Sequence, residues 1–277
     1  MKVIRDMQEW RALRKKLVGS VGFVPTMGAL HAGHASLLER SVARERITVL
    51  SIYVNPTQFN DAKDLAAYPD TLEDDLQLAE QLGVDFVILP TYGDMYADGF
   101  RFQVEENQLS RSLCGADRPG HFTGVLTIVM KLLNLVAPDR AYFGKKDYQQ
   151  YTLIRDMCET FFMNVEIVGC ETVRELDGLA MSSRNKLLDA ETRSRVAVFY
   201  DVLSSASSDK AAILALENFG FKVDYVETIG QRRFGAIVVG PQSEKVRLID
   251  NVVIEAARGP GRSFLQGDKN TTTVSAG

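Results

Sequence analysis

The 277-residue chain has few of the residue types that mark disulfide-stabilised, membrane-spanning or nucleic-acid-binding proteins. Its three cysteines, Cys114, Cys158 and Cys170, are widely spaced and form no metal-ligand pattern, so we expect reduced, buried thiols and a cytoplasmic protein. It has no run of about 18 apolar residues, and its polar N-terminal segment lacks a signal-peptide core, so we expect neither membrane insertion nor export. The formal charge of −4 argues against a general nucleic-acid binder, which usually carries a basic balance.

The remaining composition is that of an ordinary globular protein, with 45% hydrophobic and 25% charged residues. These fractions argue against a disordered or fibrous chain. A chain of this length buries roughly three quarters of its unfolded surface and has room for one large or two modest domains.

Histidine is also scarce, and two of the three histidines, His31 and His34, lie in the most informative stretch of the chain. The apolar run Val21–Val24 predicts a buried strand, which Pro25 ends because proline cannot donate to a sheet ladder. Gly28 then allows a tight turn into a helix. Because the two histidines are three residues apart, we expect both imidazoles on one face of the first helical turn, beside backbone N–H groups that lack an intrahelical partner.

A helix start of this kind suits a polyphosphate. Free N–H groups and the helix dipole favour negative charge, Gly33 leaves room for backbone or ligand, and imidazoles can donate hydrogen bonds to phosphoryl oxygens. The alternative is a pair of exposed histidines without a function, which is the commoner origin of a bare His-x-x-His pattern. The strand, proline and glycine in front of the histidines favour the functional interpretation.

The next segments complete a βαβ unit. The helix continues through Ser36–Arg44, and the β-branched run Ile47–Val54 predicts a strand buried on both faces of a parallel sheet, with a right-handed crossover. Asn55–Phe59 follows at the carboxyl end of that strand, where open α/β sheets bind their ligands, so Gln58 is a binding candidate. The alternative is a loop in which Asn-Pro only makes a turn.

Further segments extend this pattern to an α/β fold with a Rossmann-like parallel sheet. A surface helix is predicted at 4–17, buried strands at 83–90, 139–143 and 165–168, an edge strand at 100–104 and an apolar helix at 125–136. The acidic segment 70–75 is interpreted as a helix start rather than a Mg²⁺ site. The Gly-rich loop 114–125 is interpreted as facing the substrate rather than as a mere connector, because Arg118 and His121 can both meet anions.

Two more segments carry groups suited to phosphate. Lys145 and Lys146 follow Gly144 at a strand-to-helix junction, where an ammonium group can act as a mobile charge near the phosphate site, although a Lys-Lys pair is more often solvated surface. Met181–Arg184 predicts a hydroxyl-rich loop that can close over a triphosphate, with a solvated turn as the alternative.

The sequence changes character beyond residue 187. A helix at 189–204, a Ser-rich linker at 205–209 and strands at 223–228, 236–239 and 246–249 predict a small α+β unit. We expect a catalytic domain at 1–184, a smaller C-terminal domain at 185–256 and a disordered polar tail at 257–277.

Five segments, in this order, are similar to one known family. They are Pro-Thr-Met-Gly-Ala-Leu-His-x-Gly-His at 25–34, Asn-Pro-x-Gln-Phe at 55–59, Arg-Pro-Gly-His-Phe-x-Gly-Val at 118–125, Gly-x-Lys-Asp-x-x-Gln at 144–150 and Met-Ser-Ser-Arg at 181–184. They resemble the nucleotidylyltransferase superfamily and, within it, the pantothenate synthetase (pantoate–beta-alanine ligase) family. Two positions depart from the family pattern, with Lys145 in place of Glu and Asp70 in place of a basic residue.

The resemblance implies an AMP-forming acid–amine ligase. It would condense pantoate with beta-alanine through pantoyl adenylate, with Mg-ATP as a substrate, a C-terminal lid and a homodimeric assembly. His34, His31 and Lys146 would be catalytic, Gln58 would bind pantoate and beta-alanine, and Gln150 would bind pantoate. The implied ATP-binding residues are Met27, Gly28, Ala29, Leu30, His31, Ala32, Gly33, His34, Gly144, Lys145, Lys146, Asp147, Val173, Met181, Ser182, Ser183 and Arg184. No metal ligand is assigned. The alternatives are a related nucleotidylyltransferase acting on a phosphate-bearing substrate and a non-catalytic nucleotide-sensing module.

Overall fold

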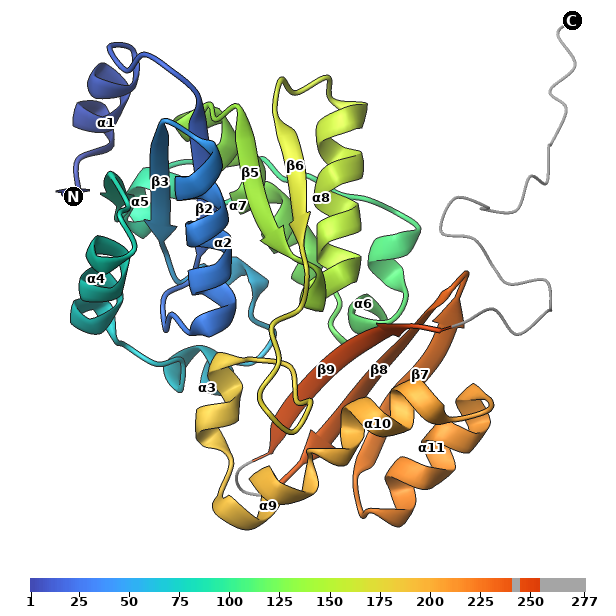
Figure 1. Cartoon of the computed structure of the whole chain (residues 1–277). Coiled ribbons are helices and arrows are strands. Elements are labelled where there is room, and N and C mark those ends of the chain that lie inside the picture. Colours follow the sequence, from blue (N-terminus) through green and yellow to red (C-terminus); the bar gives the residue numbers. More distant parts are fainter. Residues whose placement is uncertain (241–244, 255–277) are drawn as a thin grey trace, which may run out of the picture.

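Six parallel strands form the main sheet of the protein, for which a computed structural model describes residues 1–240 and 245–254 (Figure 1). In spatial order the strands are β1 (Lys2–Ile4), β4 (Phe86–Ile88), β3 (Ile47–Ile52), β2 (Val21–Thr26), β5 (Arg140–Gly144) and β6 (Glu166–Cys170). Each neighbouring pair in this order is parallel. The predicted Rossmann-like sheet is therefore confirmed.

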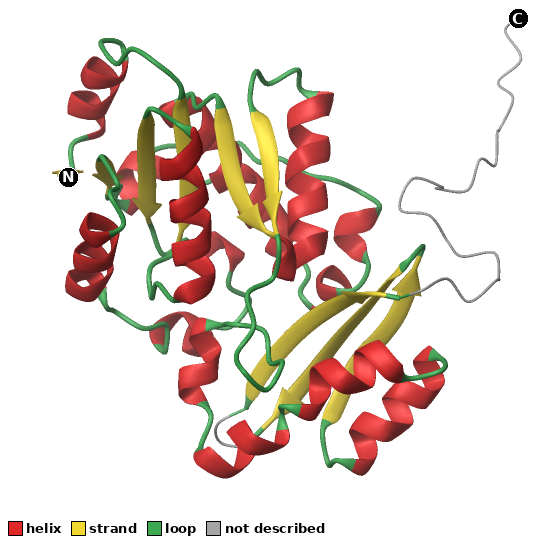
Figure 2. Ribbon diagram, viewed as in Figure 1, coloured by secondary structure: helices red, strands yellow, loops and turns green. Residues whose placement is uncertain are grey.

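Helices cover both faces of this sheet, as a parallel sheet requires (Figure 2). Leu38 packs in the core of one face with Leu50 of β3, and Trp10 packs in the core of the other with Phe23 of β2. The first face carries α2 (Ala32–Arg44) and α4 (Leu72–Gln81), and the second carries α1 (Met7–Arg14), α7 (His121–Val136) and α8 (Tyr148–Thr160). The shorter helical segments are η1 (Pro56–Gln58), α3 (Ala62–Ala66), α5 (Tyr92–Met95), η2 (Leu109–Arg111), α6 (Cys114–Asp117), η3 (Lys145–Asp147) and η4 (Ser183–Leu187).

Strand β2 does not end at Pro25, as its sequence suggested, but continues to Thr26. On the β3 side the pairing runs through Thr26, opposite Ile52, whereas on the β5 side it stops at Phe23. Pairing with β5 thus ends before Pro25, which has no N–H to extend it, while pairing with β3 continues past the proline.

Other elements also differ from expectation. The three-residue strand β1 was not predicted, because it is too short to show a period. Residues 100–104 form a loop instead of an edge strand, because side chains of Asp98 and Thr127 accept the amides of Phe102 and Val104. Helix α7 begins at His121, four residues earlier than predicted, and the single helix expected at 189–204 is two helices, α9 (Ala190–Arg195) and α10 (Val198–Ser205).

The C-terminal part is a small antiparallel sheet covered by helices, so the predicted α+β unit is confirmed. Its strands are β7 (Lys222–Ile229), β8 (Arg232–Val239) and β9 (Val246–Val253), and α10 and α11 (Asp209–Asn218) lie over one side (Figure 1). Phe199, Leu216 and Ile237 share a core cluster that also takes in Leu179. The boundary between 184 and 185 stays a prediction, and the predicted tail at 257–277 lies outside the described residues.

Within the described ranges, none of the helices is both long and apolar enough to cross a membrane.

Candidate active site

The strand order reverses beside β2, which has β3 on one side and β5 on the other. In open α/β sheets such a switch point opens a crevice at the carboxyl ends of the strands. A cavity of about 260 Å³ lies there. Of the predicted site residues, those that line it are Met27, His31, Gly33, His34, Gln58, Gly144, Lys146, Asp147, Gln150, Val173, Met181, Ser182, Ser183 and Arg184. Gly28, Ala29, Leu30, Ala32 and Lys145 are absent from the described lining of this cavity and of the larger one next to it.

The two imidazoles lie together, as their spacing predicted. Their ring centroids are 4.1 Å apart. His31 is the N-cap of α2 rather than a residue of its first turn, and its Nδ1 accepts the backbone N–H of Gly33 at 3.1 Å. A Cβ on Gly33 would lie 2.8 Å from Cε1 of His31, so this glycine makes room for the capping ring.

The turn between β2 and α2 is fixed by a carboxylate that the sequence did not single out for this purpose. Gly28 and Ala29 both have positive φ, of 82° and 50°. Asp75, at the start of α4 and only 3% exposed, accepts the amides of Ala29 at 2.9 Å and Leu30 at 2.7 Å. These two N–H groups precede the first helical turn, where free amides were expected, and they are not available to an anion; within that turn, the amide of Gly33 is already bonded to His31.

Both imidazoles are neutral at neutral pH. Burial, followed by the charge of Lys146, lowers the pKa of His31 to about 4 against the opposing effect of Asp147. Burial, followed by the charges of His31 and Lys146, lowers the pKa of His34 to about 3. Because Nδ1 of His31 accepts the Gly33 amide, the proton of the neutral ring is on Nε2. The ring can thus donate one hydrogen bond without carrying a charge.

The side chain of Gln58 is held by its own turn, η1. Asn55, only 1% exposed, donates from Nδ2 to Oε1 of Gln58 at 3.0 Å, and its own Oδ1 accepts the hydroxyls of Thr57 and Tyr96. With Oε1 occupied, the Nε2 group of Gln58 is the part available to a ligand. This orientation suits a ligand that presents oxygen acceptors.

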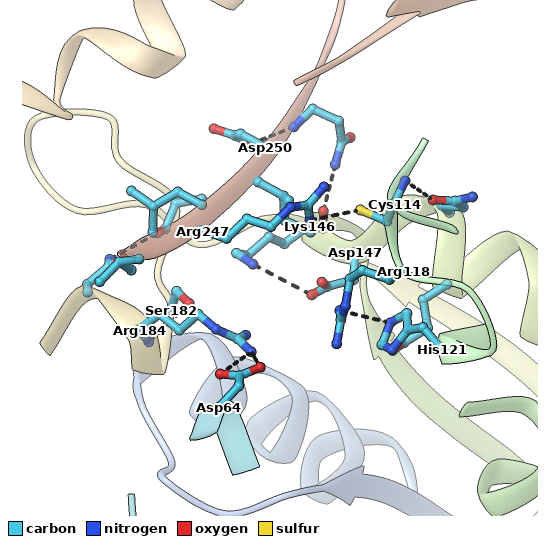
Figure 3. A pocket seen from close by; sticks show the side chains of 18 of the residues that line it. Asp64, Cys114, Arg118, His121, Lys146, Asp147, Ser182, Arg184, Arg247 and Asp250 are labelled. Carbon is cyan, nitrogen blue, oxygen red and sulfur yellow. Dashed lines mark hydrogen bonds and ion pairs between the residues drawn. The ribbon is translucent and has the colours of Figure 1, made fainter. Parts of the chain in front are cut away.

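Arg118, just before α7, and His121, the first residue of α7, support the same turn. His121 Nδ1 donates to the carbonyl of Gln58 at 2.8 Å, and Arg118 donates from Nη2 to that carbonyl at 3.1 Å. Nε2 of His121 then accepts from Nη1 of Arg118 at 3.2 Å, which is the pairing expected of a neutral ring (Figure 3). Burial, with Arg118 next, lowers the pKa of His121 to about 4. A Cβ on Gly124 would lie 2.4 Å from the carbonyl oxygen of Thr57, so α7 can pack this closely on η1 only with glycine there.

The two lysines after β5 have different surroundings. Lys146 lines both cavities, and its ammonium nitrogen lies 3.8 Å from the carboxylate of Asp147 (Figure 3). Lys145 instead forms an ion pair with Glu171, just after β6. Only Lys146 of this pair is therefore placed to meet a ligand in the cavity.

A second cavity of about 670 Å³ opens next to the first, between α3, η3 and β9. Arg184 and Asp64 point toward each other at one side of it in Figure 3, and Nη2 of Arg184 lies 3.1 Å from the Asp64 carboxylate. Arg118, Lys146 and Arg184 line both cavities. The two cavities thus share a cationic border.

Comparison with known proteins agrees with this geometry. The model of the pantoate-beta-alanine ligase family matches residues 1–253. The chain belongs to this family. Membership in the pantoate–beta-alanine ligase family makes the chain an enzyme of the ligase class.

Similar members come from several bacteria. The pantothenate synthetase of Bdellovibrio bacteriovorus is 52% identical over 252 residues, which cover 91% of this chain and 99% of the relative. That of Legionella pneumophila is 48% identical over 256 residues, covering 92% and 100%. The pantoate-beta-alanine ligase of Francisella tularensis, solved in complex with beta-gamma ATP and beta-alanine, has a TM-score of 0.86 and 38% identity, covering 91% of this chain and 97% of that one. The Thermus thermophilus pantothenate synthetase has a TM-score of 0.83 and 40% identity, with coverage of 91% and 99%.

Several residues around this ligase site escaped sequence reasoning. Asn55 was interpreted only as part of a turn, Asp75 only as part of a helix start, and Asp64 was not singled out. Arg118 and His121 were expected to face the substrate, and they do border the cavities, but their hydrogen bonds go to the Gln58 backbone. Asp70, one of the two departures from the family pattern, is exposed and outside the described cavity linings.

Proposed function

We propose that the chain condenses pantoate with beta-alanine in an ATP-dependent reaction that passes through pantoyl adenylate and releases AMP and pyrophosphate. The observation that carries this proposal is the convergence of His31, His34, Lys146, Gln58 and Gln150 on one cavity at the switch point of the sheet. Groups suited to a polyphosphate and groups suited to a small hydroxy acid thus face the same space, within a chain that belongs to the pantoate–beta-alanine ligase family.

In the first step, the pantoate carboxylate attacks the α-phosphorus of ATP, the bond from that phosphorus to the bridging oxygen breaks, and pyrophosphate leaves. Negative charge then grows on the α-phosphoryl oxygens and on pyrophosphate. His31 can donate from Nε2 to these oxygens, His34 stands beside it, and Lys146 supplies a positive charge. Donors fixed before the reaction need little reorganisation as charge develops.

Pantoate is held by the two glutamines in this proposal. Gln58 presents Nε2 because Asn55 occupies its oxygen, and Gln150, from the first turn of α8, lines both cavities. Two amides are suited to the carboxylate and hydroxyl oxygens of a hydroxy acid and would orient its carboxylate for attack.

The loop Met181–Arg184 is proposed to close over the triphosphate. Its start is fixed, since Met181 donates its amide to the carbonyl of Val173 at 3.0 Å. Val173 is proposed to contact the adenine ring, as the family resemblance implies. Arg184 at its other end pairs with Asp64, and it would exchange this carboxylate for phosphate oxygens when the nucleotide binds.

In the second step, the amine of beta-alanine attacks the acyl carbon, the bond to the AMP oxygen breaks, and pantothenate forms. Beta-alanine is proposed to bind beside Gln58. Closure of the loop excludes water, which would otherwise hydrolyse the mixed anhydride.

Mg²⁺ is proposed to arrive with ATP as part of the substrate. The described residues contain no group of three side chains arranged to hold a metal ion. Mg²⁺ at nucleotide sites commonly takes phosphate oxygens and water together with one or two carboxylates. Asp147 lines both cavities and is the carboxylate placed to take part, whereas Asp61, Asp64 and Asp250 line only the larger cavity. The homodimer and the cytoplasmic location stay predictions of the sequence resemblance and composition.

The function is tested by product formation with the purified protein. Pyrophosphate release should require pantoate, and AMP formation in steady state should require pantoate and beta-alanine together. The alternative nucleotidylyltransferase would release pyrophosphate with a phosphate-bearing substrate and none with pantoate. A protein that binds ATP but forms neither product would be the nucleotide-sensing module.

A further inference from the structure

The C-terminal sheet reaches the proposed phosphate-binding lysine through one buried side chain. Asn251, on β9 and 3% exposed, donates from Nδ2 to the backbone carbonyls of Lys145 at 3.0 Å and Lys146 at 2.8 Å. Both carbonyls belong to η3, the single turn that carries Lys146 away from β5. The sheet therefore holds the backbone of the lysine rather than its ammonium group.

The orientation of the Asn251 amide is determined by its surroundings. Arg232 on β8 donates from Nη1 to Oδ1 of Asn251, and a guanidinium can only donate. The two carbonyls on the other side can only accept, so Nδ2 must face them. Arg232 is itself stacked on the ring of Tyr148, with 4.0 Å between the guanidinium carbon and the ring centroid. One amide thus links a strand of the C-terminal sheet to η3 and to the start of α8.

The residue before it ties the same strand to a second segment of the site. Asp250, also 3% exposed, forms a bidentate ion pair with Arg174, with Nη1 and Nη2 at 2.6 and 3.0 Å from its two carboxylate oxygens. Arg174 follows Val173, the proposed adenine contact. Adjacent residues of β9 therefore contact both the turn that bears Lys146 and the loop that follows β6.

We infer that Asn251 is a positioning residue for Lys146, so that the C-terminal sheet, when seated on η3, sets the place of the positive charge in phosphoryl transfer. This inference deepens the proposed function and rests on it. A buried amide whose three polar contacts are all satisfied is rigid. A lysine side chain is flexible, so fixing its backbone narrows the range of positions that its ammonium group can occupy.

The test compares N251A with K146A and with the double variant N251A/K146A. Pantoate-dependent exchange between ATP and pyrophosphate reports the first step alone. N251A should lower its maximal rate on the order of 10-fold to 100-fold, the range expected when a catalytic group is misplaced by about 1 Å. The KM for pantoate should change less than about two-fold, because the side chain of Gln58 is held separately, by Asn55. If Asn251 acts through Lys146, the double variant should be no slower than K146A, since the second change then removes nothing further.

Two further variants separate positioning from general damage. N251D keeps the size of the side chain and the acceptor for Arg232 but cannot donate to the carbonyls, so it should fold and lose rate as N251A does. T228V removes the hydroxyl contact between Thr228 and Asp209 in the same sheet, away from both cavities, and should keep the wild-type rate. Urea unfolding midpoints show how far each variant is destabilised.

The inference is overturned if N251A and N251D keep the wild-type exchange rate, if T228V loses as much, or if the losses of N251A and K146A multiply in the double variant. A wild-type protein without pantoate-dependent exchange would refute the proposed function instead. In that case calorimetric ATP binding by the wild type, N251A, K146A and N251A/K146A decides the inference. A positioned Lys146 should still strengthen nucleotide binding, and the losses of affinity should still fail to multiply.

Discussion

Replacing Asp75 by Asn should damage the histidine turn although the residue contacts neither imidazole. Its two carboxylate oxygens accept the amides of Ala29 and Leu30 at 2.9 and 2.7 Å, and Thr71 donates to it at 3.2 Å. An asparagine has one oxygen and one NH₂ group, so one of the two buried amides would face a donor. Leaving a buried donor without a partner costs about 1–3 kcal/mol of folding free energy.

The same substitution should also lower the catalytic rate. Ala29 has a φ of 50°, a conformation that residues other than glycine adopt rarely. The turn therefore depends on its hydrogen bonds to Asp75 to keep its shape. With one bond lost, His31 and His34 would move relative to the phosphate. We expect the rate of pyrophosphate release to fall on the order of 10-fold or more, as in other cases of misplaced catalytic groups.

Asp74→Asn provides the matched control. Asp74 is the preceding residue in the first turn of α4, so it interacts similarly with the helix dipole, but its side chain is exposed. Urea unfolding with an unchanged m-value, together with the pyrophosphate-release rate, measures both effects. The reasoning is refuted if D75N and D74N behave alike in both assays.

Three further changes test other parts of the site. Gly33→Ala should displace the His31 ring, because its Cβ would lie 2.8 Å from Cε1 of that ring, so activity should fall at least 10-fold while the urea midpoint changes little; wild-type kinetics would contradict this. Asp64→Asn should release Arg184 and tighten ATP binding two-fold to five-fold by calorimetry, the range of a half-exposed ion pair of up to about 1 kcal/mol, and weaker binding would count against the exchange. Burial lowers the pKa of His34 to about 3 and of His121 to about 4, so the unfolded chain takes up protons below about pH 6.5 that the folded chain does not. The free energy of unfolding should therefore be unaffected by these two rings above about pH 6.5. It should fall by about 1 kcal/mol per pH unit for each ring as the pH drops from 6.5 toward 4. A free energy of unfolding that stays flat between pH 6.5 and 5 would refute it.

The groups proposed to meet ligands could be predicted from sequence because each is set by local structure. A strand, a turn and a helix place His31 and His34 at a strand's carboxyl end, and the same rule places Gln58 and Lys146. All four line one cavity. The spacing of the histidines alone predicted the contact between their rings.

The residues that support these groups could not be predicted in the same way, because each acts across a long separation in the chain. Asp75 lies 46 residues from the Ala29 amide that it accepts, and Asn251 lies 105 residues from Lys146. No periodicity of a helix or strand links such pairs. Sequence-based reasoning therefore finds the ends of the strands but misses the bonds that fix the turns beyond them.

These supports divide the site into a rigid part and an adjustable part. Gln58 and the turn before α2 are held by Asn55 and Asp75, which are 1% and 3% exposed. Within the part of the chain that the structure describes, the guanidinium of Arg184 is bonded to Asp64 alone, in an ion pair whose side chains are 31% and 41% exposed, where water screens the attraction. The exposed ion pair is weaker than the buried hydrogen bonds of Asn55 and Asp75. Arg184 can therefore dissociate from Asp64 while the histidine turn and Gln58 stay in place. Substrates would thus enter a preformed site and be covered last, an order that protects an acyl adenylate from water because the intermediate forms only after closure.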